Sequence, residues 1–309
     1  MTRKKFLEKY GQLLCPMVTP FGEKEEVNYS AFEELIEYLI KNNLCDSIIV
    51  SGTTGEASLM TFDERAKLFK TAVKAANGRK PVIAGTGCAS TKETIALTKE
   101  AEACGIDLFM IVAPFYNKPT QKGLIDHYKA IAASIKSNIL LYNIPIFVGV
   151  NLDPSSVAEL AKVENIVGIK DEAGVNPTQI TDFFLATEKV NPEFVLINGD
   201  DIMLTPTLIQ GADGIVTGSS QIFGNEIRQI FDLYAKGENK KIKDIFTKLY
   251  RVYRLYTMGG RTLSNPIMRP AIEMVSGIKI GPARSPCTPM SDEEFRVLKD
   301  ALREVGKIK

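Results

Sequence analysis

Eight short apolar runs, rich in β-branched residues, recur along the 309-residue chain and are separated by longer amphipathic stretches. Runs of this length and composition are typical of buried strands. Their first residues are 19 to 34 positions apart, which suits repeated strand–helix units. The predicted strands are Leu13–Val18, Ser47–Ser51, Pro81–Thr86, Asp107–Val112, Asn138–Tyr142, Asn165–Lys170, Phe194–Asn198 and Asp213–Thr217.

The stretches between these runs repeat their apolar residues with the period of an α-helix. Two of them begin with sequence patterns typical of helix starts. Asp153 can cap a helix whose first residue is Pro154, and Thr61 with Glu64 three positions later forms a capping-box pattern. Strands that alternate with helices in this way predict a closed parallel (β/α)8 TIM barrel, with an open doubly wound sheet as the alternative. The helices predicted between strands are Ser30–Asn42, Thr61–Ala76, Thr91–Ala103, Gln121–Ile135, Pro154–Ala161, Pro177–Glu188 and Asp201–Gln210.

The strand pattern stops after Ser220, and only helices are predicted beyond it. We therefore divide the chain into a barrel, 1–235, which carries the active site, and a C-terminal helical extension, 236–309. A piece of this size buries little surface alone, so we expect it to pack on the barrel or on a second subunit. Glu226–Tyr234 is predicted to complete the eighth strand–helix unit of the barrel. The helices predicted in the extension are Lys240–Tyr256, Pro266–Val275 and Asp292–Val305.

Composition excludes several classes of partner. Lys and Arg number 38 against 37 Asp and Glu, so no nucleic-acid or anionic-membrane surface is expected. Five scattered cysteines without a CxxC motif indicate a reducing compartment, no disulfide framework and no zinc site. The N-terminus lacks the apolar core of a signal peptide, and no apolar run approaches the roughly 20 residues that span a bilayer. These features predict a cytoplasmic protein.

Polar residues follow the predicted strands at the end where TIM barrels hold their active sites. The sixth strand ends at Lys170. A lysine withdrawn from water loses affinity for its proton, and a neutral amine adds to carbonyl groups. The alternative is a surface lysine that pairs with Asp171 or Glu172. The other polar strand ends are Gly52–Glu56, Ala113–Pro119, Tyr142–Pro145, Asn198–Asp201 and Thr217–Ser220.

These strand ends would bring Lys170 close to tyrosine and threonine hydroxyls. A chain from Tyr142 through Thr53 to Tyr116 could carry the protons that Schiff-base and enamine formation require. The single histidine, His127, falls within a predicted helix, and we interpret it as a structural surface residue. Without a histidine or cysteine cluster, metal-assisted chemistry has no evident ligands. A metal-free lysine mechanism with no cofactor is therefore predicted.

Three other motifs offer groups that bear on ligand binding. Gly52–Gly55 offers backbone N–H groups and hydroxyls in a tight turn, which suits the carboxylate of a 2-keto acid. Gly85–Cys88 lacks the third glycine of a dinucleotide-binding loop. The Asp200–Asp201 pair is interpreted as a helix cap rather than as a metal site.

Taken together, the motifs resemble the dihydrodipicolinate synthase / N-acetylneuraminate lyase family of class I, pyruvate-type aldolases. The resemblance covers nearly the whole chain, residues 12–300, and rests on motifs in the right order. It implies a barrel with a C-terminal helical extension. The motifs are Pro16–Phe21, Gly52–Glu56, Pro114–Pro119, Tyr142–Pro145, Gly168–Lys170, Gly199–Asp201 and Gly281–Pro286.

This resemblance implies roles for individual residues. Lys170 would form the Schiff base, with Tyr142 as the acid/base group over it. Thr53 and Thr54 would hold the keto-acid carboxylate and relay the proton, and Tyr116 would enter from a neighbouring subunit. Pyruvate and an aldehyde would be the substrates of a homotetramer built as two dimers. The remaining expected substrate-binding residues are Gly52, Gly199, Val216 and Phe147.

Phe147 bears on the identity of the aldehyde. Synthases of the family carry an arginine shortly after the Tyr-Asn-x-Pro motif, where it holds the carboxylate of aspartate semialdehyde, and Phe147 stands in that place. A phenylalanine cannot pair with a carboxylate. We therefore expect reversible cleavage of a 2-keto-3-deoxy sugar acid, with 2-keto-3-deoxygluconate as the best single choice.

Several alternatives stay open. A 4-hydroxy-tetrahydrodipicolinate (dihydrodipicolinate) synthase, an N-acetylneuraminate lyase and a keto-acid dehydratase would keep the chemistry and change the substrate. A non-catalytic barrel that binds a keto acid belongs to another class, and the set of Thr53, Tyr116, Tyr142 and Lys170 speaks against it. A phosphate-binding barrel would need a glycine-rich loop, of which Gly218–Ser220 is a weak version.

Overall fold

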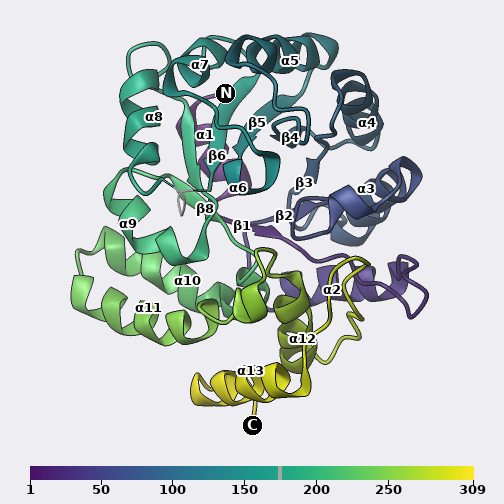
Figure 1. Ribbon diagram of the computed structural model, residues 1–309. Helices are drawn as coiled ribbons and strands as arrows, with labels where there is room; N and C mark the ends of the chain where they lie inside the picture. The colour runs from purple at the N-terminus through teal and green to yellow at the C-terminus, as the bar shows by residue number, and fades with distance from the viewer. Residues whose placement is uncertain (173–175) are drawn as a thin grey trace.

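Eight parallel strands close into a barrel in sequence order, and β8 pairs back to β1. The computed structural model describes residues 1–172 and 176–309, and Figure 1 shows helices surrounding the strands. The closed ring confirms the TIM barrel and excludes the open sheet, which would leave two edges unpaired. The strands are β1 (Leu13–Pro16), β2 (Ser47–Val50), β3 (Val82–Gly85), β4 (Leu108–Val112), β5 (Asn138–Asn143), β6 (Ile166–Asp171), β7 (Val195–Asn198) and β8 (Gly214–Val216).

Burial of the strands on both faces explains why their positions could be predicted from the sequence. Every residue of β1, β2 and β6 is buried, so these strands read as continuous apolar runs rather than as alternating ones. β6 and β7 also approach closely at Gly168, where an added Cβ would overlap the backbone carbonyl of Val195 only 2.5 Å away. Sequence-based strand boundaries agree with the structure to within two residues.

The barrel helices follow the predicted pattern. The capping box at the start of α3 is confirmed, because the Thr61 hydroxyl accepts from the Glu64 N–H and the Glu64 carboxylate accepts from the Thr61 N–H. No helix in the described ranges is both long and apolar enough to cross a membrane. The helices are α2 (Tyr29–Lys41), α3 (Phe62–Ala76), α4 (Thr91–Ala103), α5 (Gln121–Ser134), α7 (Pro154–Leu160), α8 (Gln179–Thr187), α9 (Leu204–Ile209) and α10 (Ser220–Ala235).

Two helices and one helix start were not predicted. α1 (Arg3–Tyr10) lies at the N-terminal end of the strands, where the Tyr10 hydroxyl donates to Asp107 at 2.8 Å. α6 (Pro145–Val148) is a single turn directly after β5. α10 begins at Ser220 rather than Glu226, across a break in helical geometry at Phe223. Segments this short or irregular show no helical period.

The C-terminal extension packs on the barrel, below it in the view of Figure 1. The Arg269 guanidinium in α12 is 1% exposed and forms an ion pair with Glu56 at 2.9 Å. The Asn265 side chain donates to the backbone carbonyl of Thr54 at 2.9 Å. The extension therefore reaches the strand ends where the active site was predicted. Its elements are α11 (Asn239–Tyr253), the 3-10 helix η3 (Met258–Gly260), α12 (Asn265–Ser276) and α13 (Asp292–Glu304).

Candidate active site

Lys170 lies at the carboxyl end of β6 and is only 5% exposed. Its ammonium nitrogen is 3.8 Å from the centre of the Tyr142 ring, and the two residues are register partners across β5 and β6. Successive side chains of a strand point to opposite sides, so Asp171 turns away and accepts hydrogen bonds from Asn143 and Gln179. Among the described residues no carboxylate pairs with Lys170. A surface lysine in a local ion pair is therefore excluded.

Two hydroxyls meet next to this lysine. The Thr53 Oγ1 atom, in the turn after β2, is 3.4 Å from the Tyr142 hydroxyl oxygen, and Tyr142 is 2% exposed. Either hydroxyl can donate, so the pair can pass a proton in either direction. The predicted contact between Thr53 and Tyr142 is present, and Lys170 lies beside it. Three elements far apart in sequence thus bring an amine and two hydroxyls together.

A cavity of about 340 Å³ contains these three side chains. The expected substrate-binding residues Thr54, Gly199, Val216 and Phe147 also line it, whereas Gly52 lines a neighbouring cavity. A Cβ at position 199 would lie 2.3 Å from the Lys170 Cε atom, so a larger residue there would displace the lysine side chain.

Sequence reasoning did not predict several residues of this cavity wall. Tyr253, Tyr256 and Asn265 come from the extension and line the cavity that contains Lys170. The sequence does not indicate that these residues come close to Lys170, because their position depends on how α11 and α12 pack on the barrel. The carboxyl groups of Glu172 and Asp200 line the cavity as well.

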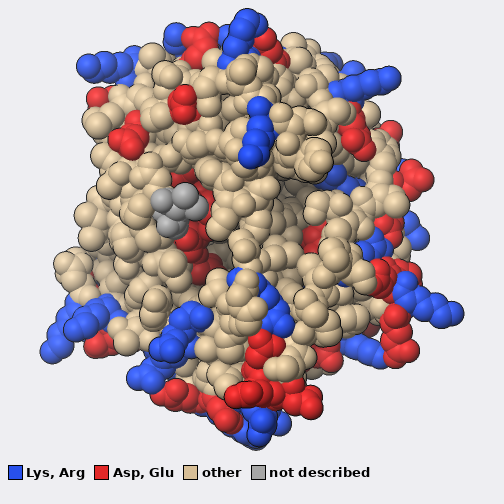
Figure 2. Space-filling view, in the orientation of Figure 1, with Lys and Arg blue, Asp and Glu red and all other residues tan. Residues whose placement is uncertain are grey.

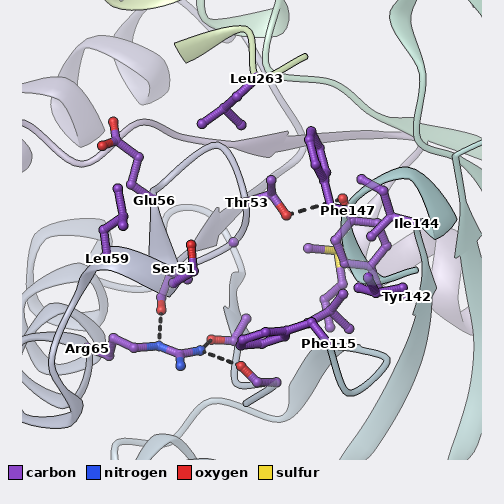
Figure 3. Close-up of a pocket in the computed structure, with 18 residues that line it drawn as sticks. Ser51, Thr53, Glu56, Leu59, Arg65, Phe115, Tyr142, Ile144, Phe147 and Leu263 are labelled. Carbon is purple, nitrogen blue, oxygen red and sulfur yellow. Dashed lines mark hydrogen bonds between the residues drawn. The ribbon is translucent and has the colours of Figure 1, made fainter. Parts of the chain in front are cut away.

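Tyr116 does not join this group within one chain. Its side chain is 91% exposed and lines neither the cavity of Lys170 nor the neighbouring one. The neighbouring cavity, about 370 Å³, shares Thr53, Tyr142 and Phe147 with the first and is drawn in Figure 3. The relay from Tyr142 through Thr53 to Tyr116 is therefore not complete within a single copy of the chain.

Arg65 lies at the far side of this neighbouring cavity, and its guanidinium donates hydrogen bonds to other groups of the protein (Figure 3). Its guanidinium donates to the Ser51 hydroxyl at 2.8 Å and to the backbone carbonyls of Gly85 and Gly87 at 3.0 and 3.1 Å. A fourth contact joins it to the Cys88 sulfur at 3.3 Å. Arg65 therefore braces the loops after β2 and β3, and most of its donors are unavailable to a substrate carboxylate.

Burial sets the protonation of the carboxyl groups around the site. Desolvation is the main cause that raises the pKa of Asp171 to about 6, although hydrogen bonds from Asn143 and Gln179 oppose it. Desolvation likewise raises the pKa of Asp201 to about 6. The Asp200 side chain accepts from the N–H of Ile202 at 3.0 Å, as expected of a helix cap.

His127 is a correction to the sequence-based interpretation. It lies in α5 as predicted, but it is 4% exposed and therefore not on the surface. Its Nδ1 atom is 2.9 Å from the Thr91 hydroxyl, and burial lowers its pKa to about 4. The amphipathic pattern of a helix does not determine whether a polar residue between its apolar and polar faces is buried. Packing of α5 against α4 buries His127.

Comparison with known proteins identifies the family. Residues 9–305 match the dihydrodipicolinate synthetase family. The chain belongs to this family. It is 38% identical over 298 residues to the 4-hydroxy-tetrahydrodipicolinate synthase of Oceanobacillus iheyensis, covering 96% of this chain and 97% of that one. It is 40% identical over 292 residues to 4-hydroxy-tetrahydrodipicolinate synthase 1 of Halalkalibacterium halodurans, covering 94% and 96%.

A solved structure agrees with this assignment. The crystal structure of a dihydrodipicolinate synthase from Bacillus anthracis superimposes with a TM-score of 0.89 at 36% identity, covering 96% of this chain and 98% of that one. As a member of the dihydrodipicolinate synthetase family, the protein is a pyruvate-dependent lyase that works through a lysine Schiff base without a cofactor. The expected reaction class is therefore confirmed.

The comparisons do not support 2-keto-3-deoxygluconate, the substrate expected from the sequence. The named relatives of this family member are 4-hydroxy-tetrahydrodipicolinate synthases, and none is a 2-keto-3-deoxygluconate aldolase. They support the synthase alternative better than the sugar-acid prediction, which rests on Phe147 and the apolar residues beside it. A few pocket positions carry less information than similarity over nearly the full chain.

Proposed function

We propose that the protein condenses pyruvate with an aldehyde through a Schiff base at Lys170. The observation that carries this proposal is the burial of Lys170 beside the hydrogen-bonded pair of Tyr142 and Thr53. The lysine nitrogen adds to the pyruvate ketone carbon, and water leaves to form a protonated imine. Loss of a methyl proton then gives an enamine, whose carbon attacks the aldehyde and regenerates the imine. Attack on that imine by water, or by an amine of the second substrate, releases Lys170. Tyr142 and Thr53 transfer the protons of these steps.

We propose aspartate semialdehyde as the aldehyde, so that the product is 4-hydroxy-tetrahydrodipicolinate. The support is the name shared by the relatives at 35–40% identity. Phe147 specifically favours a second candidate, cleavage of a 2-keto-3-deoxy sugar acid, because it lines the cavity without offering a charge to a carboxylate. Both candidates pass through the same imine and enamine at Lys170. They differ in the group that enters beyond Phe147 and in whether an amine of the substrate or water releases Lys170.

Substrate profiling separates the two candidates. The wild-type protein is incubated with pyruvate and either aspartate semialdehyde or glyceraldehyde, and the initial rate of pyruvate consumption is measured. We expect kcat/KM to be at least about tenfold higher with the semialdehyde, since a charged hydrogen-bond contact is worth about 1.5–3 kcal/mol. Turnover of glyceraldehyde alone would select the sugar-acid candidate. Borohydride reduction with pyruvate, followed by mass spectrometry of the Lys170 peptide, tests the shared first step.

We also propose that Tyr116 completes the site of a second copy in a homotetramer. Support comes from its 91% exposed ring and from the empty space of the neighbouring cavity beside Thr53 and Tyr142. Its backbone φ of 71° is uncommon for a residue other than glycine, and such geometry is kept where it serves a purpose. Sedimentation equilibrium measures the mass of the assembly, and a monomer at assay concentration would contradict the proposal.

Replacing Tyr142 with phenylalanine is expected to slow enamine formation about 10²- to 10⁴-fold, the usual contribution of a positioned acid/base group. The ring over Lys170 is kept, and only the hydroxyl that contacts Thr53 is lost. Exchange of pyruvate methyl protons with deuterated water, followed by NMR, measures this step without any aldehyde. Tyr250→Phe on exposed α11 is the matched control. Unchanged exchange in the Tyr142 variant would remove it from the mechanism.

A further inference from the structure

Glu172 lies two residues beyond Lys170 and lines the same cavity. Glu172 follows the last residue of β6, and both it and Lys170 line the cavity, whereas Asp171 turns outward toward Asn143. The Glu172 N–H donates to the backbone carbonyl of Asn143 at 3.0 Å, which continues the pairing of β5 with β6 and holds the residue in place. Glu172 is therefore positioned by the barrel itself.

The cavity is rich in carboxyl groups. Its charged side chains, within the described residues, are Lys170 and the three acids Glu172, Asp200 and Asp201. Figure 2 shows acidic atoms inside the hollow at the centre of this face. Asp200 caps the 3-10 helix that follows it, and Asp201 accepts a hydrogen bond from Ser219. No side chain in residues 1–172 or 176–309 donates a hydrogen bond to the Glu172 carboxyl group or forms an ion pair with it.

Glu172 is half-buried, and a carboxyl group without a partner in such a cavity favours the binding of a cation. Desolvation is the main cause that raises the pKa of Glu172 to about 8; Lys170 opposes the shift, whereas Asp200, Asp201 and Asp171 add to it. A positively charged N–H donor supplies both the missing charge and the missing hydrogen bonds. At neutral pH the raised pKa keeps the Glu172 carboxyl group largely protonated; an ammonium group beside it lowers this pKa again and pairs with the carboxylate that forms.

Two residues that line the cavity also carry a buried polar atom without a partner among the described residues. The Tyr253 hydroxyl belongs to a side chain that is 3% exposed, and Asn265 Oδ1 to one that is 0% exposed. Neither atom makes a hydrogen bond within the described part of the chain, although both residues line the cavity. Buried polar atoms without partners are uncommon in folded proteins. Both atoms are themselves covered by protein, so it is the residues, and not these atoms, that line the cavity.

We infer that Glu172 binds the ammonium group of the second substrate and thereby selects an amino aldehyde over an aldehyde of the same carbon chain without the amine. The inference rests on the proposed function, because aspartate semialdehyde carries such an ammonium group. Phe147 leaves the carboxylate of this substrate without an arginine partner in the cavity lining that the structure describes. Recognition of the substrate is therefore assigned to its ammonium end.

A pair of aldehydes tests this role. Succinate semialdehyde has the carbon chain and carboxylate of aspartate semialdehyde but lacks its amine. Glu172→Gln keeps the size of the side chain and removes its charge. We expect the ratio of kcat/KM for aspartate semialdehyde to that for succinate semialdehyde to fall about 10- to 100-fold in the variant, the range expected when a charged hydrogen bond is lost. Initial rates of pyruvate consumption give the ratio.

Glu164→Gln provides the matched control, since Glu164 is exposed just before β6 at the opposite end of the strand. It is expected to leave the ratio unchanged. An equal loss with both aldehydes in Glu172→Gln would show a structural role and overturn the inference, as would an unchanged ratio.

A calorimetric readout needs no turnover. Homoserine and 4-hydroxybutyrate are the alcohols that correspond to the two aldehydes, and they can be titrated into wild-type protein and into Glu172→Gln. We expect the variant to weaken homoserine binding about 10- to 100-fold and to leave 4-hydroxybutyrate binding unchanged. Equal binding of both alcohols by the wild-type protein would overturn the inference. Failure of the proposed function appears separately, as the absence of a borohydride-trapped pyruvate on Lys170.

Discussion

Replacing Lys170 with alanine is expected to lower aldol turnover by roughly 10⁴-fold or more, the scale seen when a covalent nucleophile is removed. Lys170→Arg is expected to be equally inactive, because a guanidinium keeps its positive charge but does not give up a proton to become a nucleophile. The comparison of these two variants separates nucleophilicity from charge. Pyruvate consumption and borohydride trapping are the two measurements.

The control for this prediction is Lys162→Ala, on the surface beside Glu159. It is expected to keep the wild-type rate and the trapped adduct, since exposed ion pairs contribute little. A borohydride-reduced pyruvate adduct in Lys170→Ala, on any other lysine and with turnover preserved, would contradict the assignment of the Schiff base to Lys170.

Replacing Arg269 with alanine is expected to reduce the free energy of unfolding by about 3–5 kcal/mol, because it leaves the Glu56 carboxylate buried without its partner. Both side chains are at most 1% exposed, and their N–O distance is 2.9 Å. The same guanidinium donates to the carbonyls of Thr19 and Ile280, each at 2.9 Å, and so joins α12 to the loop after β1. Urea denaturation followed by circular dichroism measures the change.

A surface ion pair serves as the comparison for Arg269. Arg251 contacts Glu304 between α11 and α13, and both side chains are more than half exposed. Arg251→Ala is expected to change the free energy of unfolding by about 0–1 kcal/mol. Equal effects of the two substitutions would show that the buried ion pair does not anchor the extension.

The barrel was predictable from sequence because parallel strands buried on both faces leave continuous apolar runs. β4, Leu108–Val112, was predicted to begin only one residue earlier. Lys170 and Tyr142 were predictable as partners for the same reason, since a barrel brings the carboxyl ends of all its strands to one face. α1 was missed because its burial depends on Phe6 and Tyr10 alone. A helix that buries so few residues shows no apolar period.

The aldehyde was harder to infer because its pocket is assembled from distant segments. Phe147 and the apolar residues beside it suggested a sugar acid, whereas the named relatives support the synthase alternative. Tyr253 and Asn265 are more than 80 residues beyond Lys170 in sequence, and only the packing of α11 and α12 on the barrel brings them to the cavity. No local pattern could have indicated that contact.

Sequence by itself determined the closed barrel and the lysine at the end of its sixth strand, because hydrophobic period and strand order are local properties. Tertiary structure decided that Lys170 is enclosed beneath the Tyr142 ring, that Tyr116 stays outside its own site, and that Glu172 lines the cavity. These outcomes depend on burial and on the approach of segments far apart in the chain, which no stretch of sequence encodes alone.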